Sequence, residues 1–143
     1  TSECGPVFET IAALNQAGIA WRAARDATRG GVAAVCQEWA RASGRSIELW
    51  ESRIPLTPEV RGGCELLGLD PLFLANEGTI VVAVPADQAG AAVEAMRRVE
   101  QSAQATVVGR VVGAGIAPVS VVGSLGRARP LDEPTGALLP RIC

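Results

Sequence analysis

The chain has 143 residues, which is enough for one domain with a buried core, and its net charge is −2 with 3% aromatic residues. This balance gives no basic footprint, and no apolar run approaches the roughly 20 residues of a membrane span, so we expect neither a nucleic-acid nor a membrane partner. The sequence contains no histidine, which excludes a Ser-His-Asp triad, a Cys-His pair and an imidazole base within this chain. Any acid–base step must use carboxylates, arginine-assisted water, or a second chain or domain.

The first half of the chain predicts helices that alternate with short strands. Each predicted helix carries apolar residues three or four positions apart, and each predicted strand is short and apolar or alternates apolar with polar residues. The elements are a helix over 6–17, a strand over 19–23, a helix that opens at 26–31 and ends near 44, a strand over 46–51 and a helix over 57–67. Thr57 as N-cap and Pro58 at the first helical position mark the start of the last helix.

The second half predicts one helix among three strands. The elements are a fully buried strand over 79–84, an amphipathic helix over 86–100 and strands over 105–112 and 119–122. In the helix, Ala89, Val93 and Met96 are expected to face inward. After Gly123 no apolar periodicity remains, so residues 123–143 are predicted to form a flexible C-terminal tail that spans roughly 70 Å when extended.

These elements together predict an α/β (α+β) fold. Residues 1–122 form an α/β sandwich domain in which a mixed β-sheet is covered by helices chiefly on one face. The tail over 123–143 follows this domain.

Asp26, Thr28, Gly30 and Gly31 stand at the predicted start of the second helix. Backbone N–H groups at a helix N-terminus attract anions, and the two glycines allow a ligand to approach closely. These four residues are therefore candidates for a phosphate or magnesium site. The alternative is ordinary helix capping by Asp26 or Thr28.

Glu77 lies in the run Ala75-Asn-Glu-Gly directly before the predicted strand at 79. A carboxylate in a tight turn at a strand edge is well placed to act as a base, and it is our candidate for that role. The alternative is a turn with no chemical role, because Asn and Gly are common turn residues.

The four cysteines, at positions 4, 36, 64 and 143, form no C-x-x-C pair. They indicate neither a zinc site nor a secreted disulfide framework, so we predict no metal ligands and a cytoplasmic location. Cys143 ends the chain, where Pro140 stiffens the approach and Arg141 favours the thiolate. It is either a nucleophile that needs a free tip or an incidental surface cysteine.

The runs Asp26-Ala-Thr-Arg-Gly-Gly, Cys64-Glu-Leu-Leu-Gly-Leu-Asp-Pro, Ala75-Asn-Glu-Gly and the final Pro-Arg-Ile-Cys together resemble the HypE family. These proteins are the carbamoyl dehydratases of NiFe-hydrogenase maturation. The resemblance covers nearly the whole chain but only the C-terminal half of the family. The family's N-terminal ATP-binding domain, shared with aminoimidazole ribonucleotide synthetase and selenophosphate synthetase, would precede Thr1, so this chain alone is expected to be inactive.

The resemblance implies a fold like the C-terminal domain of the aminoimidazole ribonucleotide synthetase superfamily and a carrier role for Cys143. That thiolate accepts a carbamoyl group from a partner carbamoyltransferase, and ATP with magnesium in the intact protein drives dehydration to an S-cyanide. The cyanide passes to iron on a scaffold maturation complex, and the intact protein is a homodimer. In this scheme Glu77 removes an amide proton, and the segment 26–31 faces the nucleotide.

Two other functions agree with the same residues. The chain is a non-catalytic docking module that presents Cys143 to maturation partners, or it is part of a small-molecule kinase or synthetase of the same superfamily. In the second case the terminal cysteine has no role.

Overall fold

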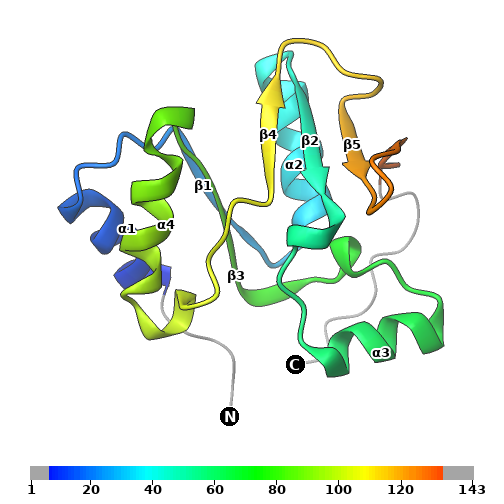
Figure 1. Cartoon of the computed structure of the whole chain (residues 1–143), viewed down its shortest axis with the longest axis horizontal. Helices are drawn as coiled ribbons and strands as arrows, with labels where there is room; N and C mark the ends of the chain where they lie inside the picture. Colours follow the sequence, from blue (N-terminus) through cyan, green and yellow to red (C-terminus); the bar gives the residue numbers. More distant parts are fainter. Residues whose placement is uncertain (1–6, 134–143) are drawn as a thin grey trace.

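The computed structural model describes residues 7–133, which form two adjoining lobes (Figure 1). The helices are α1 (Val7–Gln16), α2 (Gly31–Ser43), α3 (Pro58–Leu67) and α4 (Ala89–Arg97), with short 3-10 turns η1 (Glu51–Arg53), η2 (Pro71–Phe73), η3 (Ala86–Gln88) and η4 (Glu100–Ser102). The strands are β1 (Ala23–Ala27), β2 (Ser46–Trp50), β3 (Asn76–Ala83), β4 (Gly109–Val112), β5 (Val119–Val122) and β6 (Ala128–Pro130).

The strands form two sheets where a single mixed sheet is predicted. Strands β1 and β3 make an antiparallel pair, and the other four are ordered β4-β2-β5-β6. In the larger sheet β2 and β5 run parallel, and the remaining neighbours are antiparallel. The α/β class with a mixed sheet is confirmed, although the chain divides its strands between the two lobes.

Each lobe has its own apolar core. In the first, α1 and α4 lie beside the β1–β3 pair, and their contact centres on Leu14, Ala92 and Ala95 (Figure 1). In the second, α2 packs on the larger sheet through Ala33, Cys36 and Ala40 against Ile47, Leu49, Val119 and Val121. The small alanine side chains of α2 and α4 allow each helix to pack closely on its neighbours, as the alanine-rich and aromatic-poor composition suggests.

The predicted strand at 19–23 is wrong, and β1 begins where that prediction ends. Gly18 has a φ of 69°, its N–H bonds to the carbonyl of Asn15, and the Ile19 N–H bonds to the carbonyl of Leu14. This pair of bonds is a Schellman motif, in which the residue after the glycine packs back on the helix. Ile19 is therefore buried as part of the end of α1 rather than as a strand residue.

Two other expectations about burial are corrected. Strand β3 is only partly buried between Thr79 and Ala83, because its sheet has two strands and packs on helices α1 and α4. On α4 the fully buried residues are Ala92 and Ala95, whereas Met96 packs against the same core and Ala89 and Val93 are half-buried, so the predicted inward face is centred on the two alanines. The two alanines allow α4 to pack closely on α1, because a larger side chain at either position would separate the helices.

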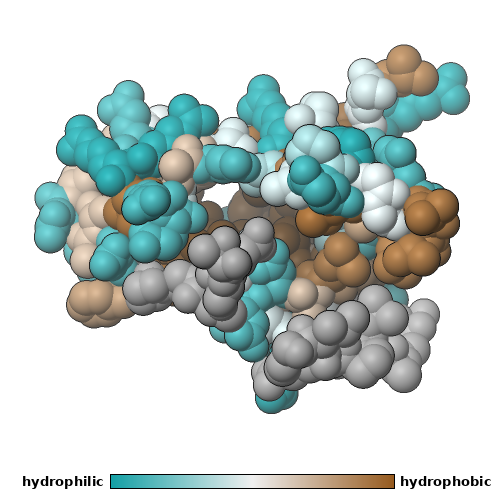
Figure 2. All heavy atoms as spheres, turned by 90° about the horizontal axis from the view of Figure 1, so that it is seen from below, coloured by the Kyte–Doolittle hydropathy of each residue, from teal (hydrophilic) through white to brown (hydrophobic). Residues whose placement is uncertain are grey.

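Helix α3 matches its prediction and stands apart from both cores. The Thr57 hydroxyl accepts a hydrogen bond from the Val60 N–H, and Pro58 occupies the first turn. Its buried residue is Cys64, whereas Leu66 is 85% exposed. Seen from below, apolar side chains gather on the right of the molecule, which is the side where α3 lies in Figure 1 (Figure 2).

The structure also extends the larger sheet beyond residue 122. Strand β6 pairs with β5, and Leu131 is buried in the core of that lobe. The segment that is predicted to be a tail from residue 123 thus contains a hairpin that belongs to the domain. The rest of the predicted tail, residues 134–143, lies outside the described residues, and so does Cys143.

Candidate functional site

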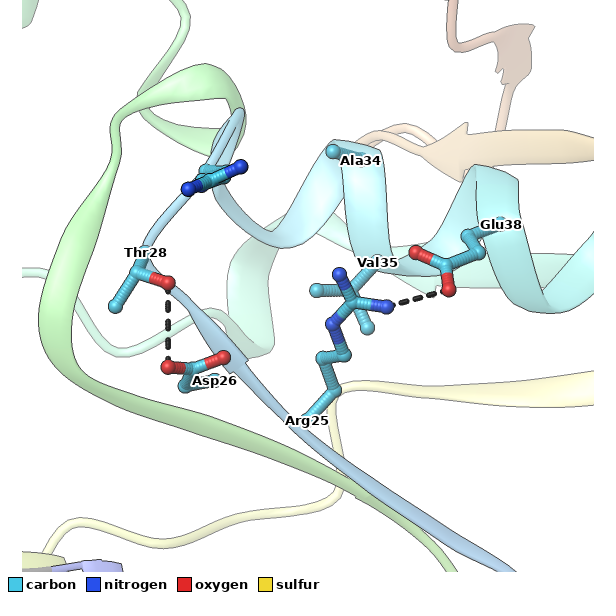
Figure 3. Close-up of a pocket in the computed structure, with 7 residues that line it drawn as sticks. Arg25, Asp26, Thr28, Ala34, Val35 and Glu38 are labelled. Atoms are coloured by element: carbon cyan, nitrogen blue, oxygen red, sulfur yellow. Dashed lines mark hydrogen bonds and ion pairs between the residues drawn. The ribbon is translucent and has the colours of Figure 1, made fainter.

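The turn between β1 and α2 contains the first predicted site. The Thr28 hydroxyl donates a hydrogen bond to the Asp26 carboxylate at 3.2 Å, and the two side chains face one another (Figure 3). The N-cap of α2 is Gly30, with a φ of 68°, and within residues 7–133 no side chain caps this end. Capping by Asp26 or Thr28 is therefore wrong as an explanation of the motif, and Gly30 and Gly31 are both buried at this end of the helix.

Gly31 has a structural role in addition to any contact with a ligand. Its φ is 66°, and a Cβ at this position would lie 2.3 Å from the carbonyl oxygen of Leu72 and 2.7 Å from that of Leu74. The start of α2 therefore packs directly on the η2 segment, which only a glycine permits. At Gly31, therefore, the group that approaches the glycine closely is the backbone of the η2 segment.

The β1–β3 pairing brings the second predicted site beside the first. Asp26 pairs with Ile80, but the next residue, Ala27, pairs with Asn76, so residues 77–79 form a bulge opposite the end of β1. Within this bulge the Asn76 side chain accepts a hydrogen bond from the Gly78 N–H at 2.7 Å. Glu77 is thus exposed in a defined turn beside the segment that leads into α2.

A small pocket lies beside the turn between β1 and α2. It has a volume of about 160 Å³ and is lined by Arg25, Asp26, Thr28, Arg29, Ala34, Val35 and Glu38. Arg25 on β1 points to Glu38 on α2 and forms an ion pair with it (Figure 3). The pocket is therefore lined by two guanidinium groups and two carboxylates, and α2 contributes Ala34, Val35 and Glu38 to it.

Sequence reasoning missed Arg25 and Glu38. Their pairing depends on the position of β1, which was expected four residues earlier, and on the face of α2 that turns toward it. The sequence around each of them gives no signal for this pairing, because the contact exists only once β1 and α2 pack together. Glu38 lies on α2 seven residues after Gly31, where it meets Arg25 of β1.

The thiol and metal chemistry of the described residues is limited. Burial raises the pKa of the Cys36 thiol to about 12, so this group is a poor nucleophile near neutral pH. Cys64 is buried as well. Between residues 7 and 133, no three Cys, Asp or Glu side chains cluster in a way that could hold a metal ion. In the same range no helix combines the length and the apolar character that crossing a bilayer requires.

Comparison with known proteins identifies the family. Residues 6–121 match the family model described as AIR synthase related protein, C-terminal domain. The chain belongs to this family. It is 46% identical over 142 residues to the carbamoyl dehydratase HypE of Rhodobacter capsulatus, which covers 99% of this chain and 42% of that protein. Against the carbamoyl dehydratase HypE of Escherichia coli (strain K12) it is 47% identical over 122 residues, or 85% of this chain and 36% of that protein.

Solved structures of family members agree with the fold. The crystal structure of E. coli HypE superimposes with a TM-score of 0.91 at 43% identity, covering 100% of this chain and 44% of that one. A HypE structure in complex with ATP gives a TM-score of 0.88 at 33% identity over 99% of this chain and 44% of that one. A HypE–HypF complex gives 0.87 at 37% identity over 93% and 43%. The predicted resemblance to HypE is confirmed, and the chain spans less than half the length of these relatives.

Proposed function

We propose that this chain is the C-terminal part of an ATP-dependent carbamoyl dehydratase that serves NiFe-hydrogenase maturation. The observation that carries the proposal is the β1–β3 pairing, which brings Glu77 beside the Asp26–Gly31 segment. Two motifs about 50 residues apart in sequence thus lie side by side at one end of a lobe. This arrangement suits a reaction that needs a base and a phosphate site together.

The proposed reaction converts a thiocarbamate on Cys143 into a thiocyanate. ATP supplies the phosphoryl group that turns the carboxamide oxygen into a leaving group. The carbon–oxygen bond then breaks, the oxygen departs with inorganic phosphate, and both protons leave the nitrogen, so that a carbon–nitrogen triple bond remains. No electrons are gained or lost, and the sulfur–carbon bond persists until the cyanide is delivered to iron on a scaffold complex.

Glu77 is the proposed base. Its carboxylate is exposed in the β3 bulge, where it can approach a substrate without rearrangement of the core. With no histidine in the chain, a carboxylate is the natural proton acceptor within it. The Asn76–Gly78 hydrogen bond holds the turn and so limits where this carboxylate points.

The proposed phosphate side is the turn that starts α2. No described side chain caps its first N–H groups, and the adjoining pocket offers Arg25 and Arg29 beside the carboxylates of Asp26 and Glu38. Asp26 is the residue there that would face a magnesium ion bound to the nucleotide. Its hydrogen bond from Thr28 fixes the orientation of the carboxylate.

The partners and assembly follow from the proposed chemistry. A carbamoyltransferase must load Cys143, and an iron-bearing scaffold must accept the cyanide. The intact protein is proposed to be a cytoplasmic homodimer that includes an ATP-binding domain. The HypE–HypF complex among the structural relatives supports a partner of the first kind.

Glu77→Gln in the intact protein tests the assignment of the base. This change keeps the shape of the side chain but removes the proton acceptor, so dehydration should slow by roughly 10²–10⁴-fold while carbamoylation of Cys143 continues. Glu94→Gln, on the exposed face of α4, is the matched control and should leave both steps unchanged. A Glu77→Gln protein that dehydrates at the wild-type rate would eliminate the base role. Cys143→Ala should abolish both steps, and normal turnover without that thiol would refute the carrier role.

A further inference from the structure

The run over residues 64–71 leads from α3 into η2, and η2 connects the two motifs of the candidate site. On one side, the carbonyl oxygens of Leu72 and Leu74 lie so close to Gly31 that a Cβ there would be 2.3 Å and 2.7 Å from them. On the other side, Leu74 stands three residues before Glu77, a distance of about 10 Å at most along the chain. The position of η2 therefore determines how the turn that carries Glu77 lies relative to the start of α2.

Asp70 is the N-cap of η2 and organises the turn. Its carboxylate Oδ1 accepts a hydrogen bond from the Leu72 N–H at 2.9 Å, and its backbone carbonyl accepts one from the Phe73 N–H at 3.1 Å. Pro71 follows with the fixed φ that suits the first position of a helical turn. Asparagine and serine offer an oxygen of the same kind at an N-cap. The cap of η2 therefore depends on the side-chain oxygen of residue 70 and not on its charge.

Two tertiary contacts hold the capped turn against its lobe. Leu72 is 3% exposed and packs in the core with Ala33 and Cys36 of α2. The second carboxylate oxygen of Asp70, Oδ2, lies 3.3 Å from the guanidinium group of Arg129 on β6. Both side chains of this pair are partly exposed, and water screens such pairs, so we expect the cap to contribute more than the charge.

We propose that Asp70 is a positioning residue that holds the Glu77 turn against the start of α2. When the cap is lost, η2 frays, and the carbonyls that lie on Gly31 move together with the chain that enters the bulge at Asn76. The catalytic consequence rests on the proposed role of Glu77 as the base. The link between the two motifs is a property of the described contacts alone.

Two conservative substitutions of Asp70 separate the cap from the charge. Asp70→Asn keeps the oxygen that caps η2 but removes the charge that faces Arg129. Asp70→Glu keeps the charge on a longer side chain that is not among the preferred N-caps. We expect Asp70→Asn to behave as the wild type and Asp70→Glu to disturb both motifs, whereas a role carried by the ion pair predicts the reverse.

The NMR amide signals of Gly31 and Gly78 in the full chain report the two motifs without reference to catalysis. The Gly78 signal reports the turn, because its N–H donates to the Asn76 side chain at 2.7 Å. Both signals should shift in Asp70→Glu and keep their wild-type positions in Asp70→Asn. Thr57→Ala is the matched control, since it removes the N-cap of α3 and should move neither signal. An Asp70→Glu chain in which either signal stays in place, or an Asp70→Asn chain in which both shift equally far, would overturn the proposal.

The dehydration rate of the intact protein tests the consequence for catalysis. Asp70→Glu should slow this step about fivefold, the usual effect of a lost N-cap on the population of a capped turn, and Asp70→Asn should keep the wild-type rate. In a Glu77→Gln background Asp70→Glu should cause no further slowing, because the base that it positions is already absent. Equal slowing in both backgrounds would overturn the proposal, since Asp70 would then act without Glu77. If Glu77→Gln alone dehydrates at the wild-type rate, the base role fails, and the Gly31 and Gly78 signals still decide whether Asp70 links the two motifs.

Discussion

Replacing Gly31 with alanine should destabilise the protein far more than replacing Gly44, although both glycines have nearly the same backbone conformation. Their φ angles are 66° and 65°, so an L-residue is strained at either position by about 1–2 kcal/mol. At Gly44 a Cβ meets nothing within 4 Å, whereas at Gly31 it would lie 2.3 Å from the carbonyl oxygen of Leu72. Relief of that overlap requires movement of the η2 segment, which adds about 1–3 kcal/mol.

Urea unfolding of the two variants measures the difference directly. With a slope of about 2 kcal/mol per molar urea, Gly44→Ala should lower the midpoint by about 0.5–1 M and Gly31→Ala by about 1–2.5 M. The difference between the variants isolates the close packing, because the conformational strain is common to both. Equal losses of stability would refute the conclusion that the start of α2 packs directly on the backbone of η2. That result would return Gly31 to a role in ligand approach alone.

Three further outcomes follow from the described contacts. Thr57→Ala removes the hydroxyl that accepts from the Val60 N–H and should lower the free energy of unfolding by about 1 kcal/mol, whereas Thr57→Ser should retain most of it. The raised pKa of Cys36 means that the folded protein keeps a proton which the unfolded chain loses above pH 9.0. The free energy of unfolding should therefore fall as the pH rises from 9 to 12, by up to about 1.4 kcal/mol per pH unit, and Cys36→Ala should flatten this fall in urea titrations. The chain by itself should hydrolyse ATP no faster than buffer in a phosphate-release assay, and robust turnover would contradict its role as part of an enzyme.

The elements that the sequence predicts well are those whose signals are local. Thr57 with Pro58 begins α3 as expected, and α2 ends with Gly44 as its C-cap, close to the predicted end near residue 44. Strand β2 alternates buried and half-buried residues as its pattern indicates. In each case the signal lies within a few residues of the feature, so no knowledge of tertiary contacts is required.

The elements that the sequence misses are created by contacts between distant segments. Strand β6, with the residues Ala-Arg-Pro, has three exposed side chains and no apolar pattern, and it exists because β5 offers an edge. Strand β1 is similarly poor in β-branched residues and is defined by its pairing with β3. The meeting of Asp26 with the turn at Glu77 depends on this register and on its bulge. Residue types indicated the chemistry of each motif, but their proximity is a property of the fold.

Mass spectrometry of Cys143 tests the central claim most directly. The intact protein is incubated with the carbamoyl donor system, first without ATP and then with it, and the C-terminal peptide is weighed. The dehydratase proposal predicts a carbamoyl adduct on Cys143 without ATP and an adduct lighter by one water once ATP is added. Glu77→Gln should stop at the first adduct. An unmodified Cys143 in a protein that still forms cyanide would contradict the account.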